Sequence, residues 1–217
     1  MPNSGNSIYF IVGYFGSGKS EFCVNFAIQK KFQYLCDLDV INPYFRSRQA
    51  NKILNENNIK IISSIDKDTK YLDMPLLSQE IFDLYTSNQK VIYDLGGSAP
   101  GAKLIKQFNA YTSQPTTTLL VVNVYRKETS DVDGIINEIK KIEQISGTTI
   151  NGLINNANLL SETNEEHLLY GQNILRQVSQ KINIPISYTS YNESIKINVP
   201  LDGEIIKLKL YLKQHNI

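Results

Sequence analysis

The sequence contains few of the residues that build metal sites and disulfide frameworks. It has no tryptophan, two histidines and two cysteines in 217 residues. Neither Cys23 nor Cys36 has another cysteine or a histidine at metal-ligand spacing, so the chain carries no zinc motif. Both cysteines lie inside apolar segments, where a free thiol packs as a small hydrophobe. We interpret them as packing residues of a protein in a reducing compartment.

An excess of one charge is also absent, and so is a long apolar run. The 22 basic and 21 acidic residues give a net charge of +1, which argues against a nucleic-acid partner. The longest apolar stretch near the N-terminus, Ile8 to Gly13, is too short for a signal-peptide core or a membrane span, and no basic segment precedes it. We therefore expect a cytoplasmic protein without membrane contact.

The residues that are present indicate one globular domain over residues 1–217, because 41% are hydrophobic and 20% are charged. Short apolar runs alternate with segments of helical period, which predicts an α/β fold: a doubly wound, mainly parallel sheet of about seven strands flanked by helices. We expect strands at Ile8–Val12, Gln33–Leu38, Lys60–Ser64, Val91–Leu95, Thr118–Val124, Thr149–Ile154 and Ile186–Thr189. We expect helices at Lys19–Lys30, Phe45–Asn57, Ser78–Thr86, Ala102–Phe108, Asp131–Ile145, Glu165–Lys181 and Gly203–Lys213.

The strongest motif follows the first expected strand. Residues 13–20 match G-x-x-x-x-G-K-[ST], the Walker A motif or P-loop, between a strand and a helix as the motif requires. Its backbone N–H groups cradle phosphates, Lys19 reaches the β- and γ-phosphates, and Ser20 supplies a hydroxyl to Mg²⁺. The expected ligands are ATP and Mg²⁺. The expected nucleotide contacts are Gly13, Tyr14, Phe15, Gly16, Ser17, Gly18, Lys19, Ser20 and Glu21.

Acidic residues stand at the ends of two expected strands, where a P-loop protein needs them to hold the metal and orient water. Asp94 ends the apolar run 91–94, and Gly97 completes a D-x-x-G pattern whose N–H can sense the γ-phosphate. Asp37 and Asp39 end the second strand on a shared face, because residues two apart in a strand point the same way. One of them is a candidate to orient the attacking water.

Three segments together, GYFGSGKS, DLDVINPYFRSR and VIYDLGGSAPGA, resemble the MinD/ParA/CobQ-like branch of P-loop ATPases. That class includes nitrogenase iron protein and signal-recognition GTPases. The resemblance implies catalytic roles for Lys19, Asp39 and Asp94, and metal binding by Ser20, Asp39 and Asp94. It departs from the branch at Tyr14, where the MinD/ParA type carries a signature lysine that contacts nucleotide across a dimer. A nucleotide-sandwich homodimer therefore stays open.

The choice between adenine and guanine nucleotides depends on residues at the end of the sixth strand, where Asn155 and Asn156 are the candidates to contact the base. No aspartate follows to complete the N-K-x-D motif that pairs with guanine, and the resemblance places an adenine-contacting asparagine here. We therefore favour ATP over GTP, with Asn155 preferred to Asn156. Arginine is scarce, and three of the four are candidate contacts to a substrate or partner: Arg46, Arg48 and Arg126.

The leading functional hypothesis is an ATP-hydrolysing switch that acts on a protein partner. An alternative is an ATP-dependent small-molecule kinase or ligase of the dethiobiotin synthetase or cobyrinate amidase type, with the Ser64–Pro75 segment lining the substrate pocket. A GTPase metallochaperone and a non-hydrolysing scaffold are further alternatives. The apolar stripe on the C-terminal helix, formed by Leu201, Ile205, Leu208 and Leu212, we expect to pack on the sheet and not on a membrane.

Overall fold

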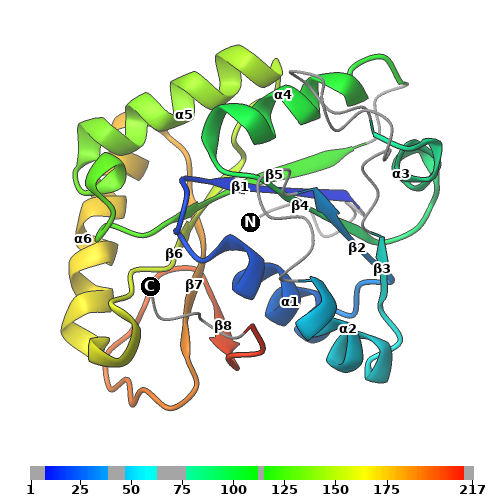
Figure 1. Cartoon of the computed structure of the whole chain (residues 1–217). Helices are drawn as coiled ribbons and strands as arrows, with labels where there is room; N and C mark the ends of the chain where they lie inside the picture. The colour runs from blue at the N-terminus through cyan, green and yellow to red at the C-terminus, as the bar shows by residue number, and fades with distance from the viewer. Residues whose placement is uncertain (1–7, 39–46, 63–76, 112–114, 213–217) are drawn as a thin grey trace.

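The computed structural model describes residues 8–38, 47–62, 77–111 and 115–212. Within these residues, eight strands form one sheet in the order β3-β2-β4-β1-β5-β6-β7-β8 (Figure 1), and every neighbouring pair is parallel. This confirms the doubly wound α/β fold, with one strand more than expected. The strands are β1 (Ile8–Gly13), β2 (Tyr34–Leu38), β3 (Lys60–Ile62), β4 (Val91–Leu95), β5 (Thr116–Val122), β6 (Gly152–Asn155), β7 (Ile186–Asn192) and β8 (Glu204–Leu208).

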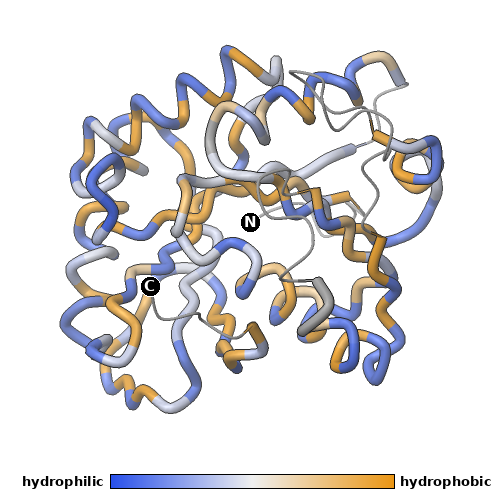
Figure 2. Tube along the Cα trace, viewed as in Figure 1, coloured by the Kyte–Doolittle hydropathy of each residue, from blue (hydrophilic) through white to orange (hydrophobic). Residues whose placement is uncertain are grey.

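Helices cover both faces of the sheet, because its central strands are apolar on both sides (Figure 2). Along β1, Ile8, Phe10 and Val12 face the core beneath α3 to α6, whereas Tyr9 and Ile11 face the core beneath α1 and α2. The helices are α1 (Lys19–Gln29), α2 (Ser47–Glu56), α3 (Gln79–Thr86), α4 (Ser98–Phe108), α5 (Val132–Ser146) and α6 (Glu165–Ile182), with short 3₁₀ turns η2 (Lys127–Thr129) and η3 (Leu160–Glu162).

Caps fix the starts of the two long helices on the same face of the sheet. The Asp131 carboxylate accepts a hydrogen bond from the Gly134 N–H at the start of α5, at 2.8 Å. Asn164 and His167 form a capping box at the start of α6, each accepting from the other's backbone N–H. His167 therefore has a structural role.

No helix among the described residues is long and apolar enough to cross a membrane.

The prediction of a helix over Gly203–Lys213 is wrong, because residues 204–208 form the edge strand β8. Ile206 and Leu208 are buried against α1, whereas Lys207 between them is exposed. This alternation has the period of a strand and dominates the weaker helical stripe. The segment therefore extends the sheet beside β7.

Candidate functional site

The P-loop leaves the carboxyl end of β1, at the centre of the sheet, and enters α1 at Lys19. Gly18 has a left-handed backbone with φ 89°, and a Cβ at this position would stand 2.4 Å from the Asn156 amide nitrogen. Only glycine fits both the conformation and the space. A turn from the Ser17 N–H to the Tyr14 carbonyl, at 3.2 Å, closes the loop. The motif therefore folds into a compact loop at the N-terminus of a helix, which favours anions.

Lys19 curls back over this loop. Its side chain is buried, and Nζ donates a hydrogen bond to the Tyr14 carbonyl at 3.1 Å. Glu128, in the loop after β5, raises the pKa of the Tyr14 phenol, mainly through a side-chain hydrogen bond. The residue that replaces the signature lysine therefore makes contacts within this chain.

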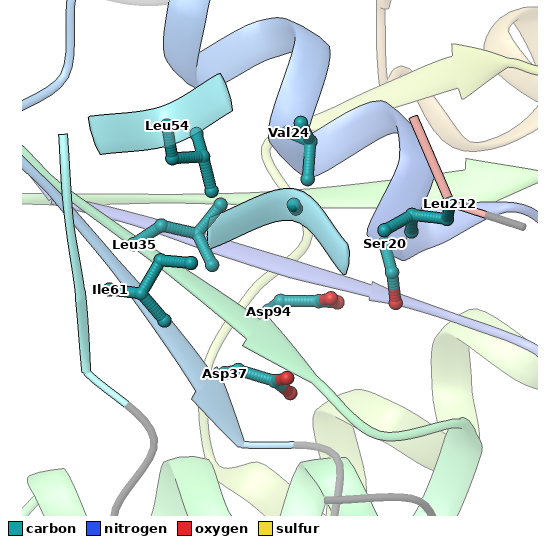
Figure 3. A pocket seen from close by; sticks show the side chains of 9 residues that line it. Ser20, Val24, Leu35, Asp37, Leu54, Ile61, Asp94 and Leu212 are labelled. Carbon is teal, nitrogen blue, oxygen red and sulfur yellow. The ribbon is translucent and has the colours of Figure 1, made fainter. Parts of the chain in front are cut away.

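Three oxygen-bearing side chains converge beside the P-loop. Ser20 from α1, Asp37 from β2 and Asp94 from β4 line one pocket, and in Figure 3 both carboxylates extend in the same direction from neighbouring strands, with the Ser20 hydroxyl pointing toward them. Asp37 and Asp94 are register partners in the parallel pairing of β2 and β4. Two adjacent carboxylates and a hydroxyl suit Mg²⁺, which takes oxygen ligands.

Apart from its oxygen-bearing side chains, this pocket has apolar walls. Six further residues line it: Val24, Leu35, Ala50, Leu54, Ile61 and Leu212. Below it, burial and the hydrogen-bonded Asp94 carboxylate raise the pKa of the Cys23 thiol well above its ordinary value. Cys23 is therefore a neutral thiol that supports Asp94 from the α1 side.

A second helix begins next to the P-loop. Gly97 caps α4, and a Cβ on Gly97 would stand 3.0 Å from the Phe15 nitrogen. The N-termini of α1 and α4 therefore lie close to one loop, and their positive dipole ends reinforce each other toward an anion. α4 begins at Ser98 rather than at the expected Ala102, because Pro100 is tolerated in the first turn of a helix.

The opposite side of the P-loop is lined by asparagines. The Asn156 amide is buried, donates to the Ser17 carbonyl at 2.7 Å and accepts from the Ser190 hydroxyl at 2.8 Å. Asn155, the preferred candidate for adenine, instead donates to the Leu168 carbonyl in α6 at 3.0 Å. Asn156 is therefore the member of the pair that lies against the P-loop, and Asn155 ties β6 to α6.

An asparagine outside the expected set, Asn123, connects the two loops on this side. Its side chain donates to the Asn158 carbonyl at 3.0 Å and accepts from the backbone N–H groups of Tyr125 and Asn158, each at 3.1 Å. The sequence contained a signal for this residue, because the polar Asn123 directly follows the apolar run of β5. We missed it because our expected strand extended to Val124 and included it.

Arg126 lies on the same side, and its Nε donates to the Gly16 carbonyl at 3.0 Å. Glu21 turns away from the loop: its carboxylate accepts from the backbone N–H groups of Tyr211 and Leu212, at 2.9 and 3.1 Å.

The remaining candidates lie outside the residues that the structure describes. They are Asp39, Arg46, the Ser64–Pro75 segment and the side chain of Arg48, whose backbone is in α2.

Comparisons with known proteins support the fold. No protein-family model and no curated protein matches the chain. Among solved structures it is similar to cell division protein FtsY from Thermotoga maritima, with 16% identity, TM-score 0.58, and coverage of 88% of this chain and 64% of that one. It is also similar to FtsY from Mycoplasma mycoides, with 17% identity, TM-score 0.54, and coverage of 89% of this chain and 62% of that one.

The signal recognition particle receptor FtsY from Elizabethkingia anophelis is also similar, at 16% identity and TM-score 0.53, covering 99% of this chain and 63% of that one. Another of its structures is in complex with GDP. The chain thus spans a little under two thirds of the length of these proteins. At such low identity the likeness concerns the fold alone: this chain has a P-loop α/β fold, and the MinD/ParA-like branch is not singled out.

Proposed function

We propose that this protein binds a magnesium nucleoside triphosphate, with ATP favoured, and hydrolyses it as a switch of MinD/ParA-like type. The observation that carries the proposal is the pocket in which Ser20, Asp37 and Asp94 converge beside the P-loop. A glycine turn with no ligand needs neither a buried lysine in the loop nor two carboxylates on adjacent strands. Together these groups match the needs of a triphosphate and its metal.

Each side chain has a defined role in this proposal. Lys19 exchanges the Tyr14 carbonyl for β- and γ-phosphate oxygens, and the two nearby helix N-termini stabilise the same negative charge. Ser20 and Asp94 would hold Mg²⁺, which neutralises charge on the phosphates when bound. Asp37 lies beside this site, and Asp39 two residues further on is our candidate to orient the attacking water.

The loop after β6 supports ATP over GTP. The residue three positions after Asn156 is Leu159, and no carboxylate occurs in residues 155–160 to accept both N–H groups of a guanine edge. The amides of Asn155 and Asn156 already bond to Leu168, Ser17 and Ser190, so the support for ATP is the missing carboxylate. The GDP complex of the similar FtsY structure makes GTP the competitor to test.

Calorimetry with Mg-ATP, Mg-ADP and Mg-GTP tests nucleotide binding directly. We expect the wild type to bind ATP more tightly than GTP, and Lys19→Ala to lose most of its affinity, because it removes the cation of the P-loop. Lys103→Ala, on an exposed position of α4, is the matched control. Identical heats for the wild type and Lys19→Ala would refute a P-loop nucleotide site.

Hydrolysis assays separate binding from turnover. We expect Asp94→Asn and Asp39→Asn to reduce kcat by about 100-fold, since each removes a carboxylate that acts on the reacting phosphate, its metal or the water. Asp37→Asn distinguishes which acid of the D-x-D pair acts. Unchanged rates in both Asp37→Asn and Asp39→Asn would exclude the pair from the mechanism.

The switch would act on a protein partner through the segments that follow Asp37 and Asp94. Tyr14 stands at the position of the signature lysine, so the P-loop has no lysine there to contact nucleotide in a second copy. Light scattering with a non-hydrolysable ATP analogue tests assembly: a monomer supports a heterologous partner, whereas a dimer that requires the analogue supports a homodimer.

The apolar wall beyond Asp37 and Asp94 favours one second candidate, an ATP-dependent small-molecule kinase or ligase. Leu35, Leu54 and Ile61 line the pocket on the side away from the P-loop, where an acceptor for the γ-phosphate would lie. Mass spectrometry of the purified protein with an ATP analogue tests this candidate. A metabolite retained only by protein with an intact apolar wall would favour it, and Leu54→Gln is the variant to compare.

A further inference from the structure

The Arg126 guanidinium faces the backbone of the P-loop. A Cβ built on Gly16 would stand 3.3 Å from both Cζ and Nε of Arg126 and 3.5 Å from its second terminal nitrogen. Three nearly equal distances mean that one face of the guanidinium is turned toward the position that this Cβ would take, while its Nε–H edge donates to the Gly16 carbonyl. Gly16 has φ 73°, so a glycine here satisfies the backbone and leaves space for the guanidinium.

The Arg126 side chain is open to solvent. Arg126 is exposed, and within the part of the chain that the structure describes no carboxylate forms an ion pair with it. Its backbone is fixed, since the Arg126 N–H donates to the Asn123 carbonyl at 3.1 Å and the Thr129 N–H donates to the Arg126 carbonyl at 2.9 Å. Tyr125 beside it packs against the rings of His167 and Tyr170. The guanidinium is thus tied to the P-loop through Nε, on a segment with a fixed backbone, and it remains exposed.

The order of the strands determines which part of a nucleotide meets this plane. β4 and β2 lie on one side of β1 and carry the acidic pocket, whereas β5, β6 and β7 lie on the other side and lead into the loops of Arg126 and Asn156. A triphosphate whose terminal phosphate lies at Ser20 and Asp94 therefore directs its base over β5 and β6. Arg126 also bonds to a carbonyl of the P-loop, while phosphates bind the N–H groups.

We propose that Arg126 is the platform on which the purine base of the bound nucleotide stacks, an inference that rests on the proposed nucleotide site. A guanidinium stacks on aromatic rings through cation–π attraction and planar contact. The Nε–H bond to the Gly16 carbonyl fixes the position of the guanidinium, and the base covers its exposed face. Asn156 and Asn158 lie beside Gly18 of the same loop.

Inorganic tripolyphosphate separates contact with the base from contact with phosphate. Calorimetry would compare Mg-ATP and Mg-tripolyphosphate in the wild type, Arg126→Ala and Lys127→Ala, the last being an exposed neighbour in η2. We expect Arg126→Ala to weaken Mg-ATP about tenfold and to leave tripolyphosphate unchanged. Lys127→Ala should change neither. Equal weakening of both ligands, or of neither, would overturn the stacking proposal.

Two further measurements separate stacking from charge and from the proposed function itself. Arg126→Lys keeps the charge but not the plane, so it should bind Mg-ATP nearly as weakly as Arg126→Ala. The preference for ATP over UTP should also fall in Arg126→Ala, because a purine offers more stacking area than a pyrimidine. Full recovery by lysine or an unchanged ATP to UTP ratio would refute the platform. Wild type that bound no nucleotide would instead refute the nucleotide site.

Discussion

Asn156 makes hydrogen bonds to several parts of the candidate site. Its amide bonds to the P-loop through Ser17 and to β7 through Ser190, and its backbone N–H donates to the Val122 carbonyl at 2.9 Å. Both side-chain bonds are buried, so water cannot replace either partner. One residue thus aligns the P-loop with the ends of three strands.

We expect Asn156→Ala to lower the free energy of unfolding by about 1–3 kcal/mol, because Ser17 and Ser190 each lose a buried hydrogen bond. Urea denaturation measures the effect. Asn173→Ala, at an exposed position of α6, serves as the control and should change the midpoint little. A midpoint for Asn156→Ala equal to that of the control would contradict the structural role.

Burial makes both thiols poor acids. It raises the pKa of Cys23 and Cys36 above the ordinary value of 9.0, so each stays protonated in the folded protein. A group whose pKa is raised by folding stabilises the protein below the pKa of the unfolded chain, and this contribution is lost as pH rises above it. We therefore expect stability to fall above about pH 9.

Thiol labelling provides the second measurement. At pH 8, iodoacetamide should leave both cysteines unmodified in the native protein and modify both in urea. Cys23→Ser tests the alkaline effect, since it should flatten part of the decline in stability with pH. Rapid labelling of the native protein, or a stability profile that stays flat to pH 10, would contradict the burial of these thiols.

At the scale of elements, α1 seals the edge of the sheet as well as starting the P-loop. Asn25 donates to the Lys209 carbonyl and accepts from its N–H, both at 2.9 Å, and Gln29 donates to the Lys207 carbonyl at 2.7 Å. Unpaired backbone groups at an edge strand pair readily with other chains. Side chains of α1 occupy these groups and hold residues 207–212 beside the site.

We expect Asn25→Ala to loosen the segment around β8, because two backbone groups of Lys209 lose their partner. Limited proteolysis should then cut near residues 207–212 faster, and the free energy of unfolding should fall by about 1–2 kcal/mol. Lys103→Ala is again a suitable control. Equal cleavage rates for the two variants would show that α1 does not hold this segment.

The sequence was sufficient for the elements that carry a clear period or a motif. β4 agrees with its expected bounds, and α1 begins at the expected Lys19, because an apolar run and the P-loop define them. β8 was missed because the stripe of Leu201, Ile205, Leu208 and Leu212 competes with an alternation only five residues long, from Ile206 to Leu210. Which pattern dominates depends on the free edge of β7, a property of the assembled sheet.

Prediction of the candidate site divides in the same way. Lys19, Ser20 and Asp94 follow from local motifs, and the structure places all three at one end of the sheet. The contacts of Asn123 and Ser190 join strands that are far apart in sequence. Only the order of the strands brings them to the P-loop, so no local pattern could indicate these partners.

For the whole molecule, nucleotide should stabilise the fold, because the site joins α1 to strands on both sides of β1. At 100 times Kd, Mg-ATP should add about 2.7 kcal/mol and raise Tm by about 5–10 °C. Differential scanning fluorimetry would show the shift, with EDTA reducing it. Lys19→Ala should show almost none, and an equal shift in that variant would indicate binding elsewhere.

The central position of β1 also determines when this site can form during synthesis. Ile8 pairs with Val91 on one side and Thr116 on the other, so β1 has no partner until β4 and β5 have left the ribosome. The P-loop is translated before β4 and β5 and acquires their support only after both have emerged. A nascent chain that ends before residue 122 would therefore carry the complete motif and still lack a competent nucleotide site.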